Sequence, residues 1–417
     1  MAVLTEKLAL DGGSKVREKP LPKRALFTEA EKQAVIALFD RSIQEGEAFG
    51  YNGPEEEAYR KEFADYLGGG FVHTVNSGTS ALYAVIGALD LEAGAEIVAP
   101  PITDAGGIMP IALMNCVPII ADAYPGSHNM GPDQFRAVLS PRTRAVVVAY
   151  IAGYPADLDP IIEIAREHNV IVIEDCAQAH GARYKGKLCG SIGDFGTFST
   201  MFGKHHATGG QGGVVFTKNE EMYWRVKRFA DRGKPYNLET DDRVVAGLNL
   251  NMNDLAATIG RVQFSKLDGF VKARRKVMAT IREDLKGAKA VSLGYEVPNT
   301  ESSYWFGIFT VDPSKIRVDL KQFTDAITAE GIPAHPNYRG TLQAHSEWFV
   351  KRRVFGKSGY PWVAPEYKGD RDPHFEVPNA VETLERTFHV GVHERYGAQE
   401  GHDIARAILK VENAYLR

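Results

Sequence analysis

Short apolar segments alternate with amphipathic ones along the first half of the chain. VHTV at residues 72–75 is followed by TSALYAVIGALDL at 79–91, whose apolar residues recur at helical spacing. The alternation continues through EIVAPP, VPIIAD, DQFRAVL, RAVVVAY, DLDPIIEIAREHN and VIVIEDC. Because helical crossovers join parallel strands, this pattern predicts a mainly parallel sheet wrapped by helices.

Three further segments flank this alternating region. A leader extends to about Arg24, and the segment from Thr28 to Glu45 has helical periodicity. Residues 253–288 read as one long helix with a bend at Asp268 or Gly269. We therefore expect helices both before and after the predicted sheet.

The last third of the chain predicts a second, smaller unit. A strand (YWFGIFTV, 304–311) and a helix (LKQFTDAITAEG, 320–331) follow the long helix. We expect a three-layer α/β/α large domain over residues 1–270 and a smaller α+β domain over 271–417. The stretch 337–378 has little periodicity, and a loop of that length indicates part of a substrate pocket or a dimer contact. Five residues in or just before this stretch are candidates for contact with a substrate: His335, Asn337, Tyr338, Arg339 and Trp348.

Composition and charge limit the class of partner. The 417 residues are 44% hydrophobic and 24% charged, which is typical of a soluble globular protein. Lys and Arg total 49 against 53 Asp and Glu, so the net charge of −4 favours a small molecule over nucleic acid or anionic lipid. The three cysteines lack zinc-site spacing, and the N-terminus lacks a signal-peptide pattern, so we expect a cytoplasmic protein. Prolines interrupt the longest apolar region (97–120), so we expect no membrane span.

The first motif with possible chemistry is NSGTSAL, residues 76–82, between a predicted strand and a predicted helix. Gly78 permits close backbone approach, and Thr79 and Ser80 offer hydroxyl and N–H groups at the positive end of the helix, which suits a phosphate. A Ser/Thr pair at a helix start is also typical of a plain N-cap. The motif alone leaves both interpretations open.

The second motif is VIVIEDCAQAHG, a buried strand that ends in acids. Glu174 and Asp175 should point to opposite faces, and the strand end is where ligands bind in open α/β sheets. A carboxylate there could bind a metal, cap a helix or pair with a protonated ring nitrogen. A metal is the weaker interpretation, because His180 is the only further ligand at useful spacing.

The third motif is FSTMFGKHHATGGQGG, residues 198–213, which places Lys204 in a glycine-rich loop between two predicted strands. In a partly closed site the ammonium would lose its proton more readily, so Lys204 could attack a carbonyl group. The loop could instead bind a phosphate without covalent chemistry. A phosphate cup, a strand-end acid and a loop lysine together are what a pyridoxal phosphate site needs.

These motifs resemble the DegT/DnrJ family of sugar aminotransferases, pyridoxal phosphate enzymes of fold type I. The likeness extends over most of the chain and includes LALDGG, NSGTSAL, APPIT, VPIIAD, VIVIEDCAQAHGARYKGKLCGSIGDFGTFS, QGGVVFT and LAATIGRVQFSKLD. The resemblance implies pyridoxal 5′-phosphate as cofactor and glutamate or glutamine as amino donor. It implies an acceptor that is a nucleotide-linked or phosphorylated keto-sugar, or a keto-cyclitol.

The resemblance also implies roles for individual residues around the cofactor. Thr79, Ser80 and Ser199 would hold its phosphate. Asp175 would pair with the pyridine nitrogen and keep it protonated, which strengthens the ring as an electron sink. Gln178 would lie near the phenolic oxygen.

Two further residues complete the implied site. Lys204 would hold the cofactor covalently and, once displaced by the amino donor, would move a proton between the donor's α-carbon and the cofactor. Asn249, in GLNLNM, would reach the cofactor phosphate of the neighbouring subunit. The resemblance therefore implies a homodimer with shared active sites.

Two departures from the family pattern lie near the implied site. Asp104 occupies the place, just after the PP-x-T turn, where the family has an aromatic residue that stacks on the cofactor. Asn251 stands where the family has Arg in its aromatic-Asn run. The resemblance therefore leaves open what stacks on the cofactor ring and how the second subunit contributes.

The loop around the lysine is the third departure, because it is one residue longer than usual. Counted from Ser199, the family lysine falls on Lys204, but counted back from Gly212 and Gly213 it falls on His205. Related sugar 3-dehydratases carry His at that place, so His205 could be the base of a dehydratase. We favour Lys204 and an aminotransferase. A non-catalytic regulator is a third hypothesis, which the intact set of motifs disfavours.

Overall fold

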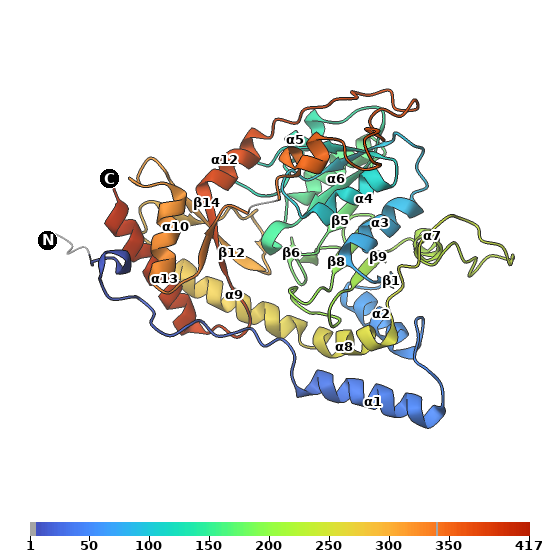
Figure 1. Cartoon of the computed structure of the whole chain (residues 1–417), viewed down its shortest axis with the longest axis horizontal. Coiled ribbons are helices and arrows are strands. Elements are labelled where there is room, and N and C mark those ends of the chain that lie inside the picture. Colours follow the sequence, from blue (N-terminus) through green and yellow to red (C-terminus); the bar gives the residue numbers. More distant parts are fainter. Residues whose placement is uncertain (1–5, 339–340) are drawn as a thin grey trace.

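A seven-stranded sheet forms the centre of the protein in the computed structural model, which describes residues 6–338 and 341–417 (Figure 1). Its strand order is β1-β9-β8-β5-β4-β2-β3. β9 is antiparallel to both its neighbours, whereas β5 is parallel to β4 and β8. The mainly parallel sheet predicted from the alternating pattern is confirmed. Its strands are β1 (Phe71–Val75), β2 (Glu96–Ala99), β3 (Val117–Ile120), β4 (Thr143–Ala149), β5 (Ile171–Asp175), β8 (Phe195–Ser199) and β9 (Gly213–Thr217).

Helices cover this sheet and explain its apolar sequence. Every residue of β2, β3, β8 and β9 is buried, as expected for strands covered on both faces. α3 packs on β8 and β9, α7 on β1 and α6 on β5. The helices of this part are α2 (Pro54–Tyr66), α3 (Gly78–Ala88), α4 (Met109–Leu113), α5 (Pro132–Ala137), α6 (Leu158–Glu167) and α7 (Glu220–Ala230), with short 3-10 turns η2 (Ala105–Gly107) and η3 (Ile151–Gly153).

A smaller antiparallel sheet follows in the order β10-β12-β14-β13. α10 packs on β13, and α13 packs on α9 and α10. Residue 270, the predicted domain boundary, falls within α9, which extends from the large sheet to the small one (Figure 1). The elements are α9 (Leu267–Asp284), β10 (Val291–Leu293), β12 (Phe306–Val311), α10 (Leu320–Ala329), β13 (Ala334–Pro336), η4 (Gln343–His345), α11 (Glu347–Val350), α12 (Pro378–Arg386), β14 (Thr387–Gly391) and α13 (Ala398–Tyr415). A third sheet joins β6 (Arg183–Tyr184) to β7 (Lys187–Leu188) and β11 (Thr300–Glu301).

Two predicted helices can be compared with the structure directly. α1 spans Glu29–Glu45 and begins at a capping box, in which Thr28 accepts from the helix and Glu31 accepts from the backbone of Thr28. The helix expected over 253–288 is two helices, α8 (Asp254–Phe264) and α9, and the bend expected at residues 268–269 was wrong. The break comes at Ser265, whose hydroxyl donates to the carbonyl of Val262 at 2.8 Å and so competes with the helix backbone.

The leader crosses the smaller sheet's helices before it reaches α1 (Figure 1). After η1 (Ala9–Asp11), Arg17 forms ion pairs with Glu400 (3.1 Å) and Asp403 (2.6 Å) of α13. Farther along, the carbonyl of Pro22 lies 3.0 Å from Nε2 of His393. The leader is thus held by side chains from the far end of the chain. Among the residues described, no helix is both long and apolar enough to cross a membrane.

Candidate active site

A cavity of about 270 Å³ opens at the carboxyl ends of the central strands. It is lined by five of the seven residues to which the sequence assigned a role: Thr79, Asp175, Gln178, Ser199 and Lys204. They come from three separate segments of the chain, residues 76–82, 170–181 and 198–213, which the sheet order β1-β9-β8-β5 brings together. Ser80 and Asn249 do not line the cavity.

One end of the cavity is built to receive an anion. Ser77 caps α3, and its Oγ accepts from the backbone N–H of Ser80 at 3.0 Å. A Cβ placed on Gly78 would lie 2.6 Å from Cβ of Ser199, so only glycine lets the first turn of α3 approach β8 this closely. The hydroxyl groups of Thr79 and Ser199 therefore lie beside the positive end of the helix, as a phosphate requires.

The two assigned residues outside the cavity have other contacts in this chain. The Ser80 hydroxyl donates to Oδ1 of Asn76 at 2.6 Å. Asn249 is exposed, and its Oδ1 accepts from Nδ2 of Asn251 at 2.8 Å. Asn249 lies opposite Asp231 in an isolated bridge. Asn249 therefore faces solvent rather than the cavity of its own chain.

The two acids at the end of β5 point to opposite faces, as predicted. Glu174 is fully buried and accepts four hydrogen bonds of 2.7 Å, from Tyr150 Oη and three backbone N–H groups of residues 190–193. It therefore fastens the turn that precedes β8. Asp175 faces the cavity, where its Oδ1 accepts from the N–H of Ala177 at 3.0 Å. Burial raises the pKa of Asp175, so a cationic partner would stabilise its charged form.

Gln178 is fixed by two hydrogen bonds. Its Oε1 accepts from the N–H of Ala152 at 2.7 Å, which helps to hold Ala152 at a left-handed φ of 55°. Its Nε2 donates to Oη of Tyr338 at 3.1 Å. The second hydrogen of Nε2 is therefore available to an acceptor in the cavity.

Lys204 is the cation of the cavity. The residue is only 8% exposed, and its Nζ lies 3.8 Å from the ring centroid of Trp305. Burial lowers the pKa of Lys204 to about 8, against the opposing attraction of Asp175 and Asp104. About a tenth of the amine is thus unprotonated and nucleophilic at pH 7, and about half at pH 8.

The two histidines after Lys204 are buried outside the cavity. Nε2 of His205 lies 3.1 Å from the carbonyl oxygen of Ser303, and Nε2 of His206 lies 2.7 Å from Oη of Tyr59. Burial lowers the pKa of both rings well below the usual value. Both histidines are therefore neutral core residues.

Other cavity residues modify the prediction. Asp104 lines the cavity and caps η2, where its Oδ1 accepts from the N–H of Gly106 at 2.9 Å. Of the late-loop candidates that the structure describes, Tyr338 lines the cavity, and Arg339 lies outside the described residues. Trp305 lines the cavity but was not predicted, because a tryptophan at the start of an apolar strand resembles an ordinary core residue.

The donor set matches the parts of pyridoxal phosphate. An anion site, a carboxylate, an amide N–H and an amine converge on one cavity, and each suits one group of the cofactor: phosphate, ring nitrogen, phenolic oxygen and aldehyde. Within the described ranges, no group of three or more His, Cys, Asp or Glu side chains is arranged to hold a metal ion. The fold and the cavity together define a pyridoxal-phosphate-dependent transferase of fold type I.

Comparison with solved structures agrees with this class. The aminotransferase from Psychrobacter cryohalolentis superimposes with a TM-score of 0.80 at 26% identity, and the alignment covers 93% of this chain and 98% of that one. The sequence profile of the DegT/DnrJ/EryC1/StrS aminotransferase family matches residues 29–358. The chain belongs to this family of sugar aminotransferases, and its cofactor is pyridoxal 5′-phosphate.

Relatives within the family have different reactions. L-glutamine:2-deoxy-scyllo-inosose aminotransferase of Streptomyces kanamyceticus is 30% identical, over 81% of this chain and 82% of that protein. GDP-perosamine synthase of Caulobacter vibrioides is 33% identical, but over 54% of this chain and 61% of that protein. dTDP-4-dehydro-2,6-dideoxy-D-glucose 3-dehydratase of Saccharopolyspora spinosa is 30% identical, over 83% of each chain. The family therefore includes both aminotransferases and a dehydratase.

Proposed function

We propose that the protein transfers an amino group from glutamate or glutamine to a keto-sugar or keto-cyclitol, with Lys204 as the residue that holds the cofactor. One observation carries this proposal. The amine of Lys204 lines the cavity together with Asp175, whereas His205 is buried on the other side of the loop. This arrangement supports Lys204 over His205 as the base and hence an aminotransferase over a dehydratase.

When bound, the cofactor supplies an aldehyde that takes up nitrogen and a ring that withdraws electrons. Lys204 would remove a proton from the donor's α-carbon and later return one to the acceptor carbon. Asp175 would hold the proton on the ring nitrogen, since a charge-assisted pair compensates the burial of its carboxylate. Gln178 would donate its free N–H to the phenolic oxygen.

The phosphate would lie at the first turn of α3. Thr79, Ser199 and the helix N–H groups are supported as its partners by the cavity they line. Ser80 would join them if its hydroxyl exchanged Asn76 for the phosphate. The exposure of Asn249 supports a role toward a second subunit, whose phosphate it would reach, so we propose a homodimer with shared sites.

The acceptor is proposed at the level of its chemical class. The relatives that support it act, by name, on an inosose, a keto-cyclitol, or form GDP-perosamine, an amino-sugar nucleotide. The first name gives a ketone on a polyol ring as the target of amination, and the second gives an amino-sugar nucleotide as the product. A nucleotide-linked or phosphorylated keto-sugar and a keto-cyclitol are accordingly the candidates to test.

The dehydratase is the second candidate, because the Saccharopolyspora relative has that activity by name. His205 would then be the base, and its ring would have to enter the cavity from the buried position it has beside Ser303. That rearrangement disfavours the dehydratase. A non-catalytic regulator is disfavoured by the complete set of groups for the cofactor.

Reductive trapping tests the proposal. The protein with pyridoxal phosphate is reduced with borohydride, and the labelled peptide is located by mass spectrometry. We expect the label on Lys204, loss of the label in Lys204→Arg, and bleaching of the visible band by glutamate or glutamine in both wild type and His205→Gln. An unlabelled wild-type protein whose dehydration activity depends on His205 would establish the dehydratase instead, and no spectral change at all would favour the regulator.

A further inference from the structure

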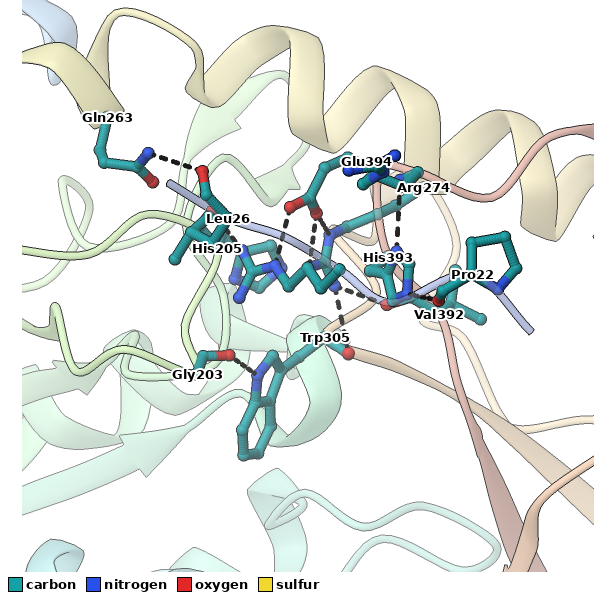
Figure 2. A network of polar contacts seen from close by, with 12 residues as sticks. Pro22, Leu26, Gly203, His205, Gln263, Arg274, Trp305, Val392, His393 and Glu394 are labelled. Atoms are coloured by element: carbon teal, nitrogen blue, oxygen red, sulfur yellow. Dashed lines mark hydrogen bonds and ion pairs between the residues drawn. The ribbon is translucent and has the colours of Figure 1, made fainter. Parts of the chain in front are cut away.

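The carbonyl groups of the two residues next to Lys204, Gly203 and His205, are held by side chains from distant parts of the chain. The indole Nε1 of Trp305 donates to the carbonyl of Gly203 at 2.7 Å (Figure 2). Nη2 of Arg24 donates to the carbonyl of His205 at 2.8 Å. These donors lie 102 residues after and 181 residues before the residues they contact, so tertiary structure alone brings them to the lysine loop.

Two buried charged groups join these donors into one network. Nη1 of Arg274 donates to the carbonyl of Trp305 at 3.2 Å, and its Nη2 lies 2.8 Å from Glu394. The other oxygen of Glu394 accepts from Nε of Arg24 at 2.7 Å. Figure 2 shows Glu394 beside Arg274, with Trp305 extending from there to Gly203. An unbroken series of contacts thus connects the carbonyl before Lys204 with the carbonyl after it.

The network is too buried to be an incidental surface contact. Arg274 is 1% exposed, and the side chain of Glu394 is 7% exposed. A buried ion pair depends on its geometry, and removing one partner leaves an uncompensated charge. Arg24 and Arg274 therefore share the charge of Glu394 in one fixed arrangement. Through Arg24 the leader becomes part of the lysine loop's support.

We propose that Arg24, acting with Glu394, Arg274 and Trp305, is a positioning residue that keeps the amine of Lys204 directed into the cavity. The inference rests on the proposed role of Lys204. The carbonyl of Gly203 lies in the peptide plane that leads into Lys204, and the carbonyl of His205 lies in the plane that follows His205. With both carbonyls held, the backbone around Lys204 has little freedom to turn, so the lysine side chain is restricted to the cavity side of the loop. Arg24, Arg274 and Glu394 do not contact the amine of Lys204 and act on it only through other residues. Trp305 does contact the amine through its ring.

Arg17 provides a matched control within the same leader. It binds two acids of α13, Glu400 and Asp403, as Arg24 binds Glu394, but among the described residues none of its side-chain hydrogen-bond or ion-pair partners belongs to the lysine loop. Arg17→Gln and Arg24→Gln each remove one cation that tethers the leader. Only Arg24→Gln also releases the carbonyl of His205.

The test measures the pKa of Lys204 in the full-length protein without cofactor. Lys204 is labelled over a range of pH by an amine-reactive reagent at limiting concentration, and the midpoint of the labelling curve gives the pKa. The midpoint depends on the surroundings of the amine and not on overall accessibility. Asp175 and Asp104 are the charged groups that face it. In wild type we expect a midpoint near the pKa of about 8 that burial produces. Release of the loop admits water and should raise the midpoint by about one unit, which reduces the unprotonated fraction at pH 8 about fivefold.

The expected pattern is a raised midpoint in Arg24→Gln and in Arg24→Lys, with Arg17→Gln unchanged from wild type. Arg24→Lys keeps the charge but cannot span Glu394 and His205 together. A raised midpoint in Arg24→Gln with a wild-type midpoint in Arg24→Lys would show that the charge of Arg24 alone matters, and would overturn the proposal. Equal shifts of the midpoint in Arg17→Gln and Arg24→Gln would also overturn it. If Arg24 variants do not fold by circular dichroism, Trp305→Phe removes the donor to Gly203 and leaves a smaller ring beside the amine. The weaker cation–π contact would lower the midpoint, so a raised midpoint in this variant must come from the released carbonyl, and an unchanged or lowered midpoint would overturn the proposal. Trapping of pyridoxal phosphate on another residue would refute the proposed function but leave this profile of Lys204 measurable.

Discussion

The burial of Lys204 in the cavity implies that its amine destabilises the cofactor-free protein. In the unfolded chain the lysine is hydrated and has its ordinary pKa of 10.5, whereas burial lowers the pKa to about 8 in the folded state. Between these two values the unfolded chain binds more protons than the folded one. The free energy of unfolding should therefore rise with pH through this window. At pH values below the window, replacing Lys204 with Met should stabilise the protein.

The size of the effect follows from the two pKa values. A shift from 10.5 to about 8, at about 1.4 kcal/mol per unit, corresponds to about 3 kcal/mol at pH 7. This destabilisation of the folded state falls to about 2 kcal/mol at pH 9, since the amine of the folded protein is then mostly neutral. With an unfolding entropy of about 2.1 cal/mol/K per residue, a chain of 417 residues changes its Tm by about 1 °C per kcal/mol. The ring of Trp305 offsets part of the cost.

Thermal unfolding of cofactor-free wild type and Lys204→Met tests this calculation. We expect the variant to melt about 2–3 °C above wild type at pH 7, and the gap to narrow by about 1 °C at pH 9. Lys187→Met, at an exposed lysine of β7, serves as the control and should show no such narrowing. A gap that is the same at both pH values, or a variant less stable than wild type at pH 7, would refute the reasoning.

Three further substitutions probe individual parts of the site. Asp175→Asn removes the carboxylate that would hold the ring nitrogen's proton, so bleaching of the cofactor band by glutamate should slow at least about 100-fold in stopped-flow measurements, and an unchanged rate would exclude that role. Gly78→Ala places a Cβ 2.6 Å from Cβ of Ser199, so titration should show at least about tenfold weaker cofactor binding with little change in Tm, because alanine favours the helix. Glu174→Gln leaves buried N–H groups of the turn before β8 without a full set of acceptors, so Tm should fall by about 2–4 °C, whereas an unaltered Tm would mean that the turn does not depend on the carboxylate.

The elements that could be predicted from the sequence are those whose pattern is local. The strand VIVIED and the helix that begins within NSGTSAL follow from apolar spacing alone. The opposite orientation of Glu174 and Asp175 follows from the alternation of side chains along a strand. β13 and β14 were not predicted, because AHP and TFHVG are too short and too mixed to show a period of two. β14 pairs with β12, which lies about 80 residues earlier in the chain, and β13 pairs with β14, which lies about 50 residues later.

The candidate site shows the same division between local and distant information. The motifs and the family resemblance together named five residues that line one cavity, but Trp305 and Arg24 contact partners more than 100 residues away, and no local pattern identifies such contacts. The choice between Lys204 and His205 depended on the same distant contacts. A loop with one extra residue can be aligned from either end, so counting left both residues possible. The carbonyls of Gly203 and His205 are held by Trp305 and Arg24, the side chain of Lys204 between them lies in the cavity, and the ring of His205 lies beside Ser303. This arrangement supports Lys204 as the base.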